Sequence, residues 1–287
     1  MLRSLFINWF QTHDLLNREG PFTFCIDYII WYIVVGLLIA VGIFFLNKYK
    51  TEKRIKIVLT VLWAVAVAID LAKLIKNIYY GFNINGDIPF YICSLYLYTM
   101  PVVIWGKGIW QRMACTYNCT IGLFGAIVNY IMPSVTVSNS LFSFAGFHTT
   151  LYHTILIATP LVMLCTGFFK LKFKDFGWSF LAFVVITFPV VIFNYIAGTD
   201  YMYFREGGIE LVKGIATTLS YGFPIVMYAV YAVVMILMQL LIMGITKLVE
   251  VIKLKIGKTI DSKQEQERID VENSSKPEVA GTEEKNE

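Results

Sequence analysis

Residues 25–47 read CIDYIIWYIVVGLLIAVGIFFLN, an apolar run that is long enough to cross a lipid bilayer as a helix. Further runs of this kind follow along the chain, and together they decide the fold class. The predicted spans are residues 25–47, 56–78, 88–106, 109–132, 148–169, 177–197 and 220–248. Because unpaired backbone groups are not tolerated in hydrocarbon, each span is expected to be a helix. The sequence therefore predicts an all-α protein, a polytopic membrane helix bundle with seven transmembrane helices.

The composition agrees with a membrane protein. Of the 287 residues, 57% are hydrophobic and only 15% are charged. A water-soluble domain cannot hide so much apolar surface, whereas lipid tails solvate it. Membrane topology and contact with anionic lipid account for the net charge of +4, so nucleic-acid binding is not expected. The predicted location is the cell membrane, as a multi-pass protein. The expected partners are membrane lipids, and the sequence identifies no protein partner.

The distribution of Lys and Arg in the loops indicates the orientation, because these residues are enriched on the cytoplasmic side. Loops on one side carry fourteen of them, namely Lys48, Lys50, Lys53, Arg54, Lys56, Lys107, Arg112, Lys170, Lys172, Lys174, Lys247, Lys253, Lys255 and Lys258. The other side carries six, namely Arg3, Arg18, Lys73, Lys76, Arg205 and Lys213. This asymmetry predicts that the N-terminus lies outside and the C-terminus in the cytoplasm. An odd number of spans agrees with that orientation.

The chain divides into three predicted parts. Residues 1–24 form an extracytoplasmic segment, which lacks the apolar core and cleavage site of a secretory signal. Residues 25–248 form the transmembrane domain. Residues 249–287 are cytoplasmic, with a basic juxtamembrane stretch followed from about Lys258 by an acidic tail without aromatic residues. Such a composition predicts disorder in the tail.

Polar side chains inside a membrane are costly, so each of them is a candidate functional residue. With the predicted orientation, five spans carry such residues in their outer halves, namely Asp70, Lys73, Cys93, Asn129, His153 and Asn194. Cys93 and His153 each lie about five residues into a span, at a depth of roughly 7–8 Å. The inner halves are nearly all apolar. These observations place the candidate site in the outer half of the bundle.

Each of these residues also has a purely structural interpretation. A lone Cys is commonly a small buried hydrophobe, and a His within a span can simply bond to another helix. Asp70, Lys73 and Lys76 have i, i+3 spacing, which favours an ion pair within one helix. His148 and His153 are five residues apart and point about 140° away from each other, so no metal site is expected. The sequence predicts no cofactor.

Three stretches carry a resemblance to a known family. They are Ile88–Leu95 (IPFYICSL), the helix with Tyr152 and His153, and Asn194–Tyr203 (NYIAGTDYMY), in that order along the chain. At these residues the chain resembles the YwaF-like integral membrane proteins of bacteria, whose wider family includes the eukaryotic transmembrane protein 164. The resemblance covers most of the seven-span region and excludes the acidic tail.

The chain departs from the bacterial pattern at three places. That pattern often has His where Tyr91 stands, and Asn where Asp200 stands. It also tends to have a Trp-Pro-Trp element where this chain reads SYGFP at residues 220–224. These differences bear on the surroundings of the candidate site, because Tyr91 and Asp200 belong to the stretches that carry the resemblance.

The resemblance implies a lipid acyltransferase, or an acyl hydrolase, that works through a Cys and a His. The matching positions are Cys93 as the nucleophile and His153 as its base. A thiolate would attack an ester carbonyl and hold the acyl group as a thioester. The expected substrate-binding residues are Asn194, Asn129, Tyr91, Asp200 and Tyr201, and among them Asn194, Asn129 or Tyr201 can donate to the developing oxyanion.

Two other classes of function are compatible with the sequence. Pro101, Pro160, Pro189 and Gly198 interrupt helices, as expected along the path of a small-solute transporter. A polar path through a transporter should reach both faces of the membrane, and the apolar inner halves argue against one. A membrane binding or assembly protein without catalytic activity is the third class.

Overall fold

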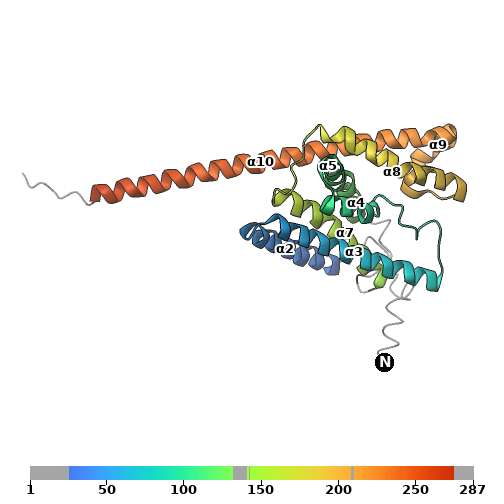
Figure 1. Ribbon diagram of the computed structural model, residues 1–287, viewed down its shortest axis with the longest axis horizontal. Helices are drawn as coiled ribbons and strands as arrows, with labels where there is room; N and C mark the ends of the chain where they lie inside the picture. Colours follow the sequence, from blue (N-terminus) through green and yellow to red (C-terminus); the bar gives the residue numbers. More distant parts are fainter. Residues whose placement is uncertain (1–25, 132–140, 142, 208–209, 275–287) are drawn as a thin grey trace, which may run out of the picture. The chain divides into compact units, whose positions relative to one another are not determined.

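The computed structural model describes residues 26–131, 141, 143–207 and 210–274, and the predicted segment 1–24 lies outside them (Figure 1). The helices are α2 (Ile26–Lys48), α3 (Glu52–Tyr80), α4 (Leu95–Trp105), α5 (Gly108–Tyr117), the π-helix η2 (Asn118–Gly122), α6 (Leu123–Ile131), α7 (Phe144–Cys165), α8 (Asp175–Ala197), the 3-10 turns η4 (Tyr201–Tyr203) and η5 (Ser220–Gly222), α9 (Glu210–Leu219) and α10 (Phe223–Ser274). The described residues contain no strand, so the all-α prediction is confirmed for them. The chain forms two compact units, Met1–Leu240 and Leu241–Glu287.

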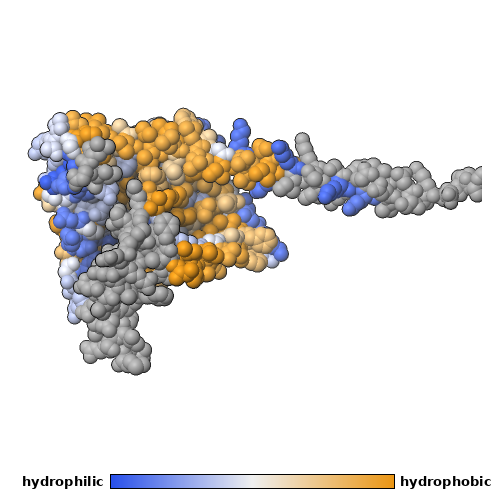
Figure 2. All heavy atoms as spheres, turned by 180° about the vertical axis from the view of Figure 1, so that it is seen from behind, coloured by the Kyte–Doolittle hydropathy of each residue, from blue (hydrophilic) through white to orange (hydrophobic). Residues whose placement is uncertain are grey.

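In the part of the chain that the structure describes, five helical stretches are long and apolar enough to cross a membrane, namely Tyr28–Lys48, Glu52–Tyr80, Phe144–Cys165, Asp175–Ala197 and Val212–Lys255. Each one overlaps a predicted span. Large apolar side chains such as Ile33, Leu37 and Val41 of α2 are exposed on them. Figure 2 shows apolar residues over much of the visible surface of the first unit and hydrophilic residues gathered at one end. A surface of this kind is solvated by lipid tails, as expected of a multi-pass membrane protein.

The predicted span 88–106 is helical only over Leu95–Trp105, since residues 81–94 have no regular structure. Pro89 disfavours helical geometry at Ile88 before it. The Ile88 N–H instead donates to the Tyr201 hydroxyl over 3.1 Å. The Asp87 carboxylate accepts hydrogen bonds of 2.6 Å from the Asn77 side chain and the Asn83 N–H. Hydropathy alone could not reveal these bonds, which hold the segment in an irregular course.

The predicted span 109–132 is a continuous helical stretch over residues 108–131, in which α5, η2 and α6 follow one another. The π turn begins at Asn118, which is buried and donates to the Thr99 hydroxyl at 3.0 Å and the Ala114 carbonyl at 2.8 Å. Short π-helical insertions are frequent at functional sites. This one leads into Gly125, which lies against the thiol of Cys93.

Helix α7 is the most deeply buried of the long apolar helices and packs against α3, α6 and η2. Its residues Tyr152, Leu156 and Met163 join Leu59 and Ala66 of α3 in one apolar core. A second core gathers α5, α8 and the beginning of α10, namely Tyr117, Phe183, Phe223, Met227 and Tyr231. The irregular segment packs against both cores, with Cys93 against the first and Ile92 against the second.

An ion pair fastens α5 to the first residue of α8. The Arg112 Nε donates to Asp175 Oδ1 at 3.0 Å, and the Lys172 N–H donates to Asp175 Oδ2 at 2.9 Å. The Arg112 guanidinium also lies over the Phe169 ring, 5.3 Å from its centroid. The Asp175 side chain is 5% exposed and that of Arg112 is 33% exposed. A charge this buried depends on its partner.

Asp175→Ala should lower the free energy of unfolding by about 3 kcal/mol, the lower end of the range for a broken buried pair, because Arg112 is partly exposed. Unfolding of the purified protein in detergent measures this. Glu52→Ala, which breaks the exposed Glu52–Lys56 pair of 2.8 Å, is the matched control and should leave unfolding unchanged. Equal unfolding of the two variants would contradict a structural role for the Arg112–Asp175 pair.

Helix α10 continues over residues 258–274, within the stretch for which the composition predicts disorder from about Lys258. The stretch is rich in Lys, Glu and Gln, and these residues have little intrinsic cost in a helix. A composition without aromatic residues indicates that a segment buries no core, which is a different property from helix formation. Residues 275–287 lie outside the described part of the chain.

Candidate functional site

The loop of residues 198–207, between α8 and α9, folds onto the irregular segment 81–94, and Tyr201 makes the connection. Its hydroxyl donates to the Ile84 carbonyl over 2.6 Å and accepts the Ile88 N–H over 3.1 Å. Its ring meets those of Phe90 and Tyr91 edge-on, with centroids 5.6 Å and 4.9 Å away. Two of the stretches that carry the family resemblance are therefore in direct contact.

Asn194 holds this loop from the end of α8. Its Nδ2 donates to the Tyr201 carbonyl at 2.8 Å, and its Oδ1 accepts the Tyr201 N–H at 2.9 Å and the Thr199 hydroxyl at 2.8 Å. The side chain is fully buried. Asn194 was expected among the substrate-binding residues. With its oxygen saturated and its amide bonded to the loop, its observed role is to shape the loop.

Asp200 closes the loop on itself. Its Oδ1 accepts the N–H groups of Arg205 at 2.8 Å and Glu206 at 2.9 Å. Partial burial raises the pKa of the Asp200 carboxyl, and these two donors oppose the rise because they stabilise the charged form. Tyr91, another expected substrate-binding residue, donates its hydroxyl to the Asn85 carbonyl at 3.1 Å. Asn129 lies partly buried on α6.

The loop contains backbone strain. Met202 and Tyr203 both have φ of 56°, a left-handed conformation that side chains other than Gly disfavour. Such geometry costs on the order of 1–3 kcal/mol per residue and persists only where the surroundings impose it. The Tyr231 hydroxyl imposes it here by donating to the Met202 carbonyl over 2.6 Å, together with the bonds of Asn194. Strain that is held in place in this way is typical of functional sites.

Cys93 lies at the end of the irregular segment, two residues before α4, and its side chain is partly exposed. A Cβ added to Gly125 would be 3.3 Å from the Cys93 sulfur, so α6 approaches the thiol closely. The Cys93 carbonyl accepts the Tyr152 hydroxyl of α7 at 3.2 Å. The helix with Tyr152 and His153 thus contacts the Ile88–Leu95 stretch at Cys93.

Three tyrosines donate to backbone carbonyl groups of the segments around Cys93: Tyr117 to Ile92 at 2.6 Å, Tyr152 to Cys93 at 3.2 Å and Tyr231 to Met202 at 2.6 Å. Tyr203, the neighbour of Met202 on the strained loop, has no hydrogen bond to its hydroxyl among the described residues, and the residue is 42% exposed. Its hydroxyl is therefore available to a ligand.

His153 is buried on α7, with 8% exposure. Its Nδ1 lies 2.7 Å from the Thr149 carbonyl, and because a carbonyl only accepts, Nδ1 carries the proton. In the neutral ring Nε2 is then the acceptor and can serve as a base. Within the described part of the chain no hydrogen bond joins the Cys93 thiol to His153. Tyr152 contacts both residues, since its ring meets that of His153 edge-on at 5.8 Å.

The structure pairs Asp70 with His148 of α7, Oδ1 to Nε2 at 3.5 Å, in place of the expected pair with Lys73. The His148 ring stacks on Tyr152, with centroids 5.7 Å apart and planes 14° apart. Helical spacing in α3 could not reveal this pair, because its partner comes from another helix. No group of three or more His, Cys, Asp and Glu side chains suited to a metal ion occurs among the described residues.

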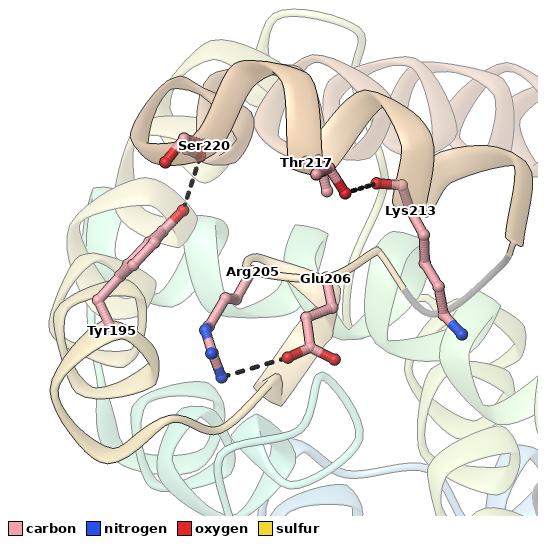
Figure 3. Close-up of a pocket in the computed structure, with 7 residues that line it drawn as sticks. Tyr195, Arg205, Glu206, Lys213, Thr217 and Ser220 are labelled. Atoms are coloured by element: carbon pink, nitrogen blue, oxygen red, sulfur yellow. Dashed lines mark hydrogen bonds and ion pairs between the residues drawn. The ribbon is translucent and has the colours of Figure 1, made fainter.

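A polar cavity of about 400 Å³ lies between the end of the 198–207 loop and helix α9 (Figure 3). It is lined by Tyr195, Arg205, Glu206, Lys213, Ala216, Thr217 and Ser220. In the sequence, Arg205 and Lys213 counted only toward the orientation of the chain. Their proximity depends on the course of the loop into α9, which no local pattern predicts.

The model of a family described as the TMEM164 family matches residues 20–245. The match includes all three stretches that carry the resemblance and the residues that line the polar cavity. No curated protein and no solved structure matches the chain.

Proposed function

Because the chain belongs to the TMEM164 family, we propose that it is an enzyme that transfers or hydrolyses acyl groups on membrane lipids, with Cys93 as nucleophile and His153 as base. The observation that carries the proposal is the position of Cys93. Cys93 is a partly buried residue of the irregular segment, which contacts α7 at Cys93 through Tyr152 and contacts the strained loop at Ile88 through Tyr201. His153 supports it, because its free Nε2 can accept a proton.

The proposal includes a topology of seven membrane crossings in the cell membrane. Besides the five long apolar helices, the stretch 108–131 forms one crossing, and α4 together with segment 81–94 forms another. The basic residues then assign the N-terminus to the outside and the C-terminus to the cytoplasm. Cys93 lies in the outer leaflet in this topology, at a depth that the ester groups of a phospholipid reach.

The reaction proceeds in two steps. The His153 Nε2 takes the thiol proton of Cys93, and the sulfur attacks the carbonyl carbon of a lipid ester. The bond from that carbon to the alcohol oxygen breaks, and the alcohol leaves with the proton held by His153. In the second step a hydroxyl of another lipid, or water, gives its proton to His153 and attacks the thioester. The acyl group moves to the new oxygen, and the thiolate recovers the proton.

The tetrahedral intermediate in each step carries a negative oxygen that needs a hydrogen-bond donor. We assign this role to Tyr203 of the strained loop, because among the described residues its hydroxyl is engaged by no hydrogen bond, whereas Tyr117, Tyr152 and Tyr231 donate to backbone carbonyl groups. Tyr203 lies on the strained loop, and the hydrogen bonds that fix the loop offset the energetic cost of its left-handed residues. Asn194 and Tyr201 position the loop that carries Tyr203, because the Asn194 side chain bonds to the Tyr201 backbone.

A thiol-directed label tests the proposal without any knowledge of the substrate. A long-chain alkyl iodoacetamide should modify Cys93 in the full-length protein in lipid nanodiscs. His153→Ala should slow this modification by about 10²-fold or more, because the thiol loses its base. Peptide mass spectrometry follows each cysteine separately. Cys165, which is exposed, is the internal control and should react at the same rate in both proteins. Equal rates at Cys93 in both proteins would contradict a Cys93–His153 pair.

A further inference from the structure

Asp70 is a carboxylate within α3, a helix long and apolar enough to cross the membrane, where a charged group is costly. Its Oδ1 lies 3.5 Å from the Nε2 of His148 on α7, and the two side chains are only 17% and 10% exposed. Among the described residues, His148 Nε2 is buried and makes no hydrogen bond, so Asp70 is the group that stabilises a proton on it. The proposed reaction uses neither residue, and the cost of burying both calls for another role.

The two lysines that follow Asp70 on α3 do not take the place of His148. The Lys76 ammonium lies over the Phe144 ring of α7, 5.8 Å from its centroid. Lys73 forms no ion pair with Asp70 in the part of the chain that the structure describes. The carboxylate of α3 therefore meets α7 at His148.

A series of direct contacts leads from this pair to the backbone of Cys93. The His148 ring stacks on the ring of Tyr152, one turn later in α7, with centroids 5.7 Å apart and planes 14° apart. Tyr152 is 3% exposed, and its hydroxyl donates to the Cys93 carbonyl at 3.2 Å. The contacts from Asp70 to Cys93 thus join three elements, namely α3, α7 and the irregular segment.

Cys93 needs such contacts because it does not lie in a regular helix. It precedes α4 by two residues, in a segment whose course depends on bonds to other elements. Its carbonyl accepts the Tyr96 N–H at 3.2 Å, which is a local turn, and the Tyr152 hydroxyl, which comes from another helix. A reacting atom that is misplaced by about 1 Å can lose about 10²-fold in rate. The bond from Tyr152 is therefore placed to matter for the reactivity of the thiol.

We propose that Asp70 and His148 are positioning residues that fix Cys93 through Tyr152. The Asp70 carboxylate orients the His148 ring, the ring holds that of Tyr152 by stacking, and the Tyr152 hydroxyl fixes the backbone at Cys93. That the position of Cys93 serves acyl transfer rests on the proposed function, whereas the control of the thiol by Asp70 and His148 does not.

The rate at which the long-chain alkyl iodoacetamide modifies Cys93 in the full-length protein in lipid nanodiscs tests the proposal. Asp70→Ala and His148→Ala should each slow this modification by about tenfold or more, because the thiol is displaced. Tyr152→Phe keeps the stacked ring and loses the bond to the Cys93 carbonyl, so it should slow the modification to a similar extent. Asp70→Glu should restore part of the rate, because it restores the carboxylate.

Trp63→Phe is the matched control on α3. It removes the bond of 2.9 Å from the indole N–H to the Leu97 carbonyl, which also joins α3 to the chain near Cys93, and it should leave the rate at Cys93 unchanged. The other thiols report on the fold in the same samples. The exposed Cys165 should react as in the wild type, and the buried Cys115 and Cys119 should stay unmodified.

The double variant Asp70→Ala/Tyr152→Phe separates positioning from a general loosening of the bundle. If Asp70 acts through Tyr152, the double variant should react at Cys93 like Tyr152→Phe alone. Effects that multiply, a wild-type rate in both alanine variants, or an equal loss in Trp63→Phe would overturn the proposal. Acyl transfer is measured in the same proteins. A wild type that transfers no acyl groups, combined with slow modification of Cys93 in Asp70→Ala, would refute the proposed function and leave the positioning role standing.

Discussion

Cys93→Ala should reduce acyl transfer in proteoliposomes by on the order of 10⁴-fold or more, which makes it the most damaging single change expected in this protein. The thioester cannot form without the sulfur. His153→Ala should be similarly damaging, because the thiol then has no base to take its proton. The double variant should be little worse than either single variant, since the two groups act as one unit. Lipidomic analysis of acyl-chain exchange between added lipids measures all three.

Cys165→Ala is the control for this series, because it removes an exposed thiol at the opposite end of α7. Its activity should equal that of the wild type. Acyl-chain exchange that persists in Cys93→Ala beside an active wild type would exclude the thioester. Effects of Cys93→Ala and His153→Ala that multiply in the double variant would instead show that the two residues act independently.

The helices of this protein were largely predictable, because hydropathy is a local property and each span is read from its own residues. The exceptions have tertiary causes. Residues 88–94 are apolar enough to continue α4, yet Pro89 and the bonds of Ile88 and Asp87 keep them irregular. The C-terminal part of α10 is an exception of another kind, since its composition predicts that it buries no core and says little about its helicity.

The sequence identifies the chemically reactive residues of the candidate site, but it does not predict the tertiary contacts around them. Cys93 and His153 stand out as reactive groups inside spans, and the contact of Tyr152 with Cys93 brings their two stretches together. Asn194 was assigned to the substrate because an amide in a span is rare. Its bonds to Tyr201, across a turn, show that it shapes the loop. Tyr203 is one of many tyrosines in the sequence. Only the structure shows that Tyr117, Tyr152 and Tyr231 donate to carbonyl groups, whereas the Tyr203 hydroxyl does not among the described residues.

The strained conformation of the 198–207 loop is imposed at more than one point. Met202 and Tyr203 are consecutive left-handed residues, and the bonds of Tyr231 and Asn194 to the loop hold them. Gly207 ends the loop with φ of 82°, and a Cβ there would come within 2.6 Å of the Val212 side chain. The surroundings therefore fix the position of Tyr203 on the loop.

Tyr203→Phe should lower the rate of acyl transfer by about 10²–10³-fold, as expected when one donor to a developing oxyanion is lost. The variant keeps the ring and removes only a hydroxyl that has no hydrogen-bond partner among the described residues, so its stability should match that of the wild type. The rate is measured in proteoliposomes under saturating lipid, and stability is measured by thermal unfolding in detergent.

Tyr117→Phe is the contrasting variant, because it makes the same chemical change at another tyrosine near Cys93. It removes the 2.6 Å bond to the Ile92 carbonyl, which should cost about 1 kcal/mol of stability and leave the oxyanion donor in place. Tyr203→Phe therefore acts on the rate and Tyr117→Phe on the unfolding free energy. A wild-type rate in Tyr203→Phe would remove this residue from the proposed mechanism. Asn129 would then be the next candidate for the hydrogen-bond donor to the oxyanion.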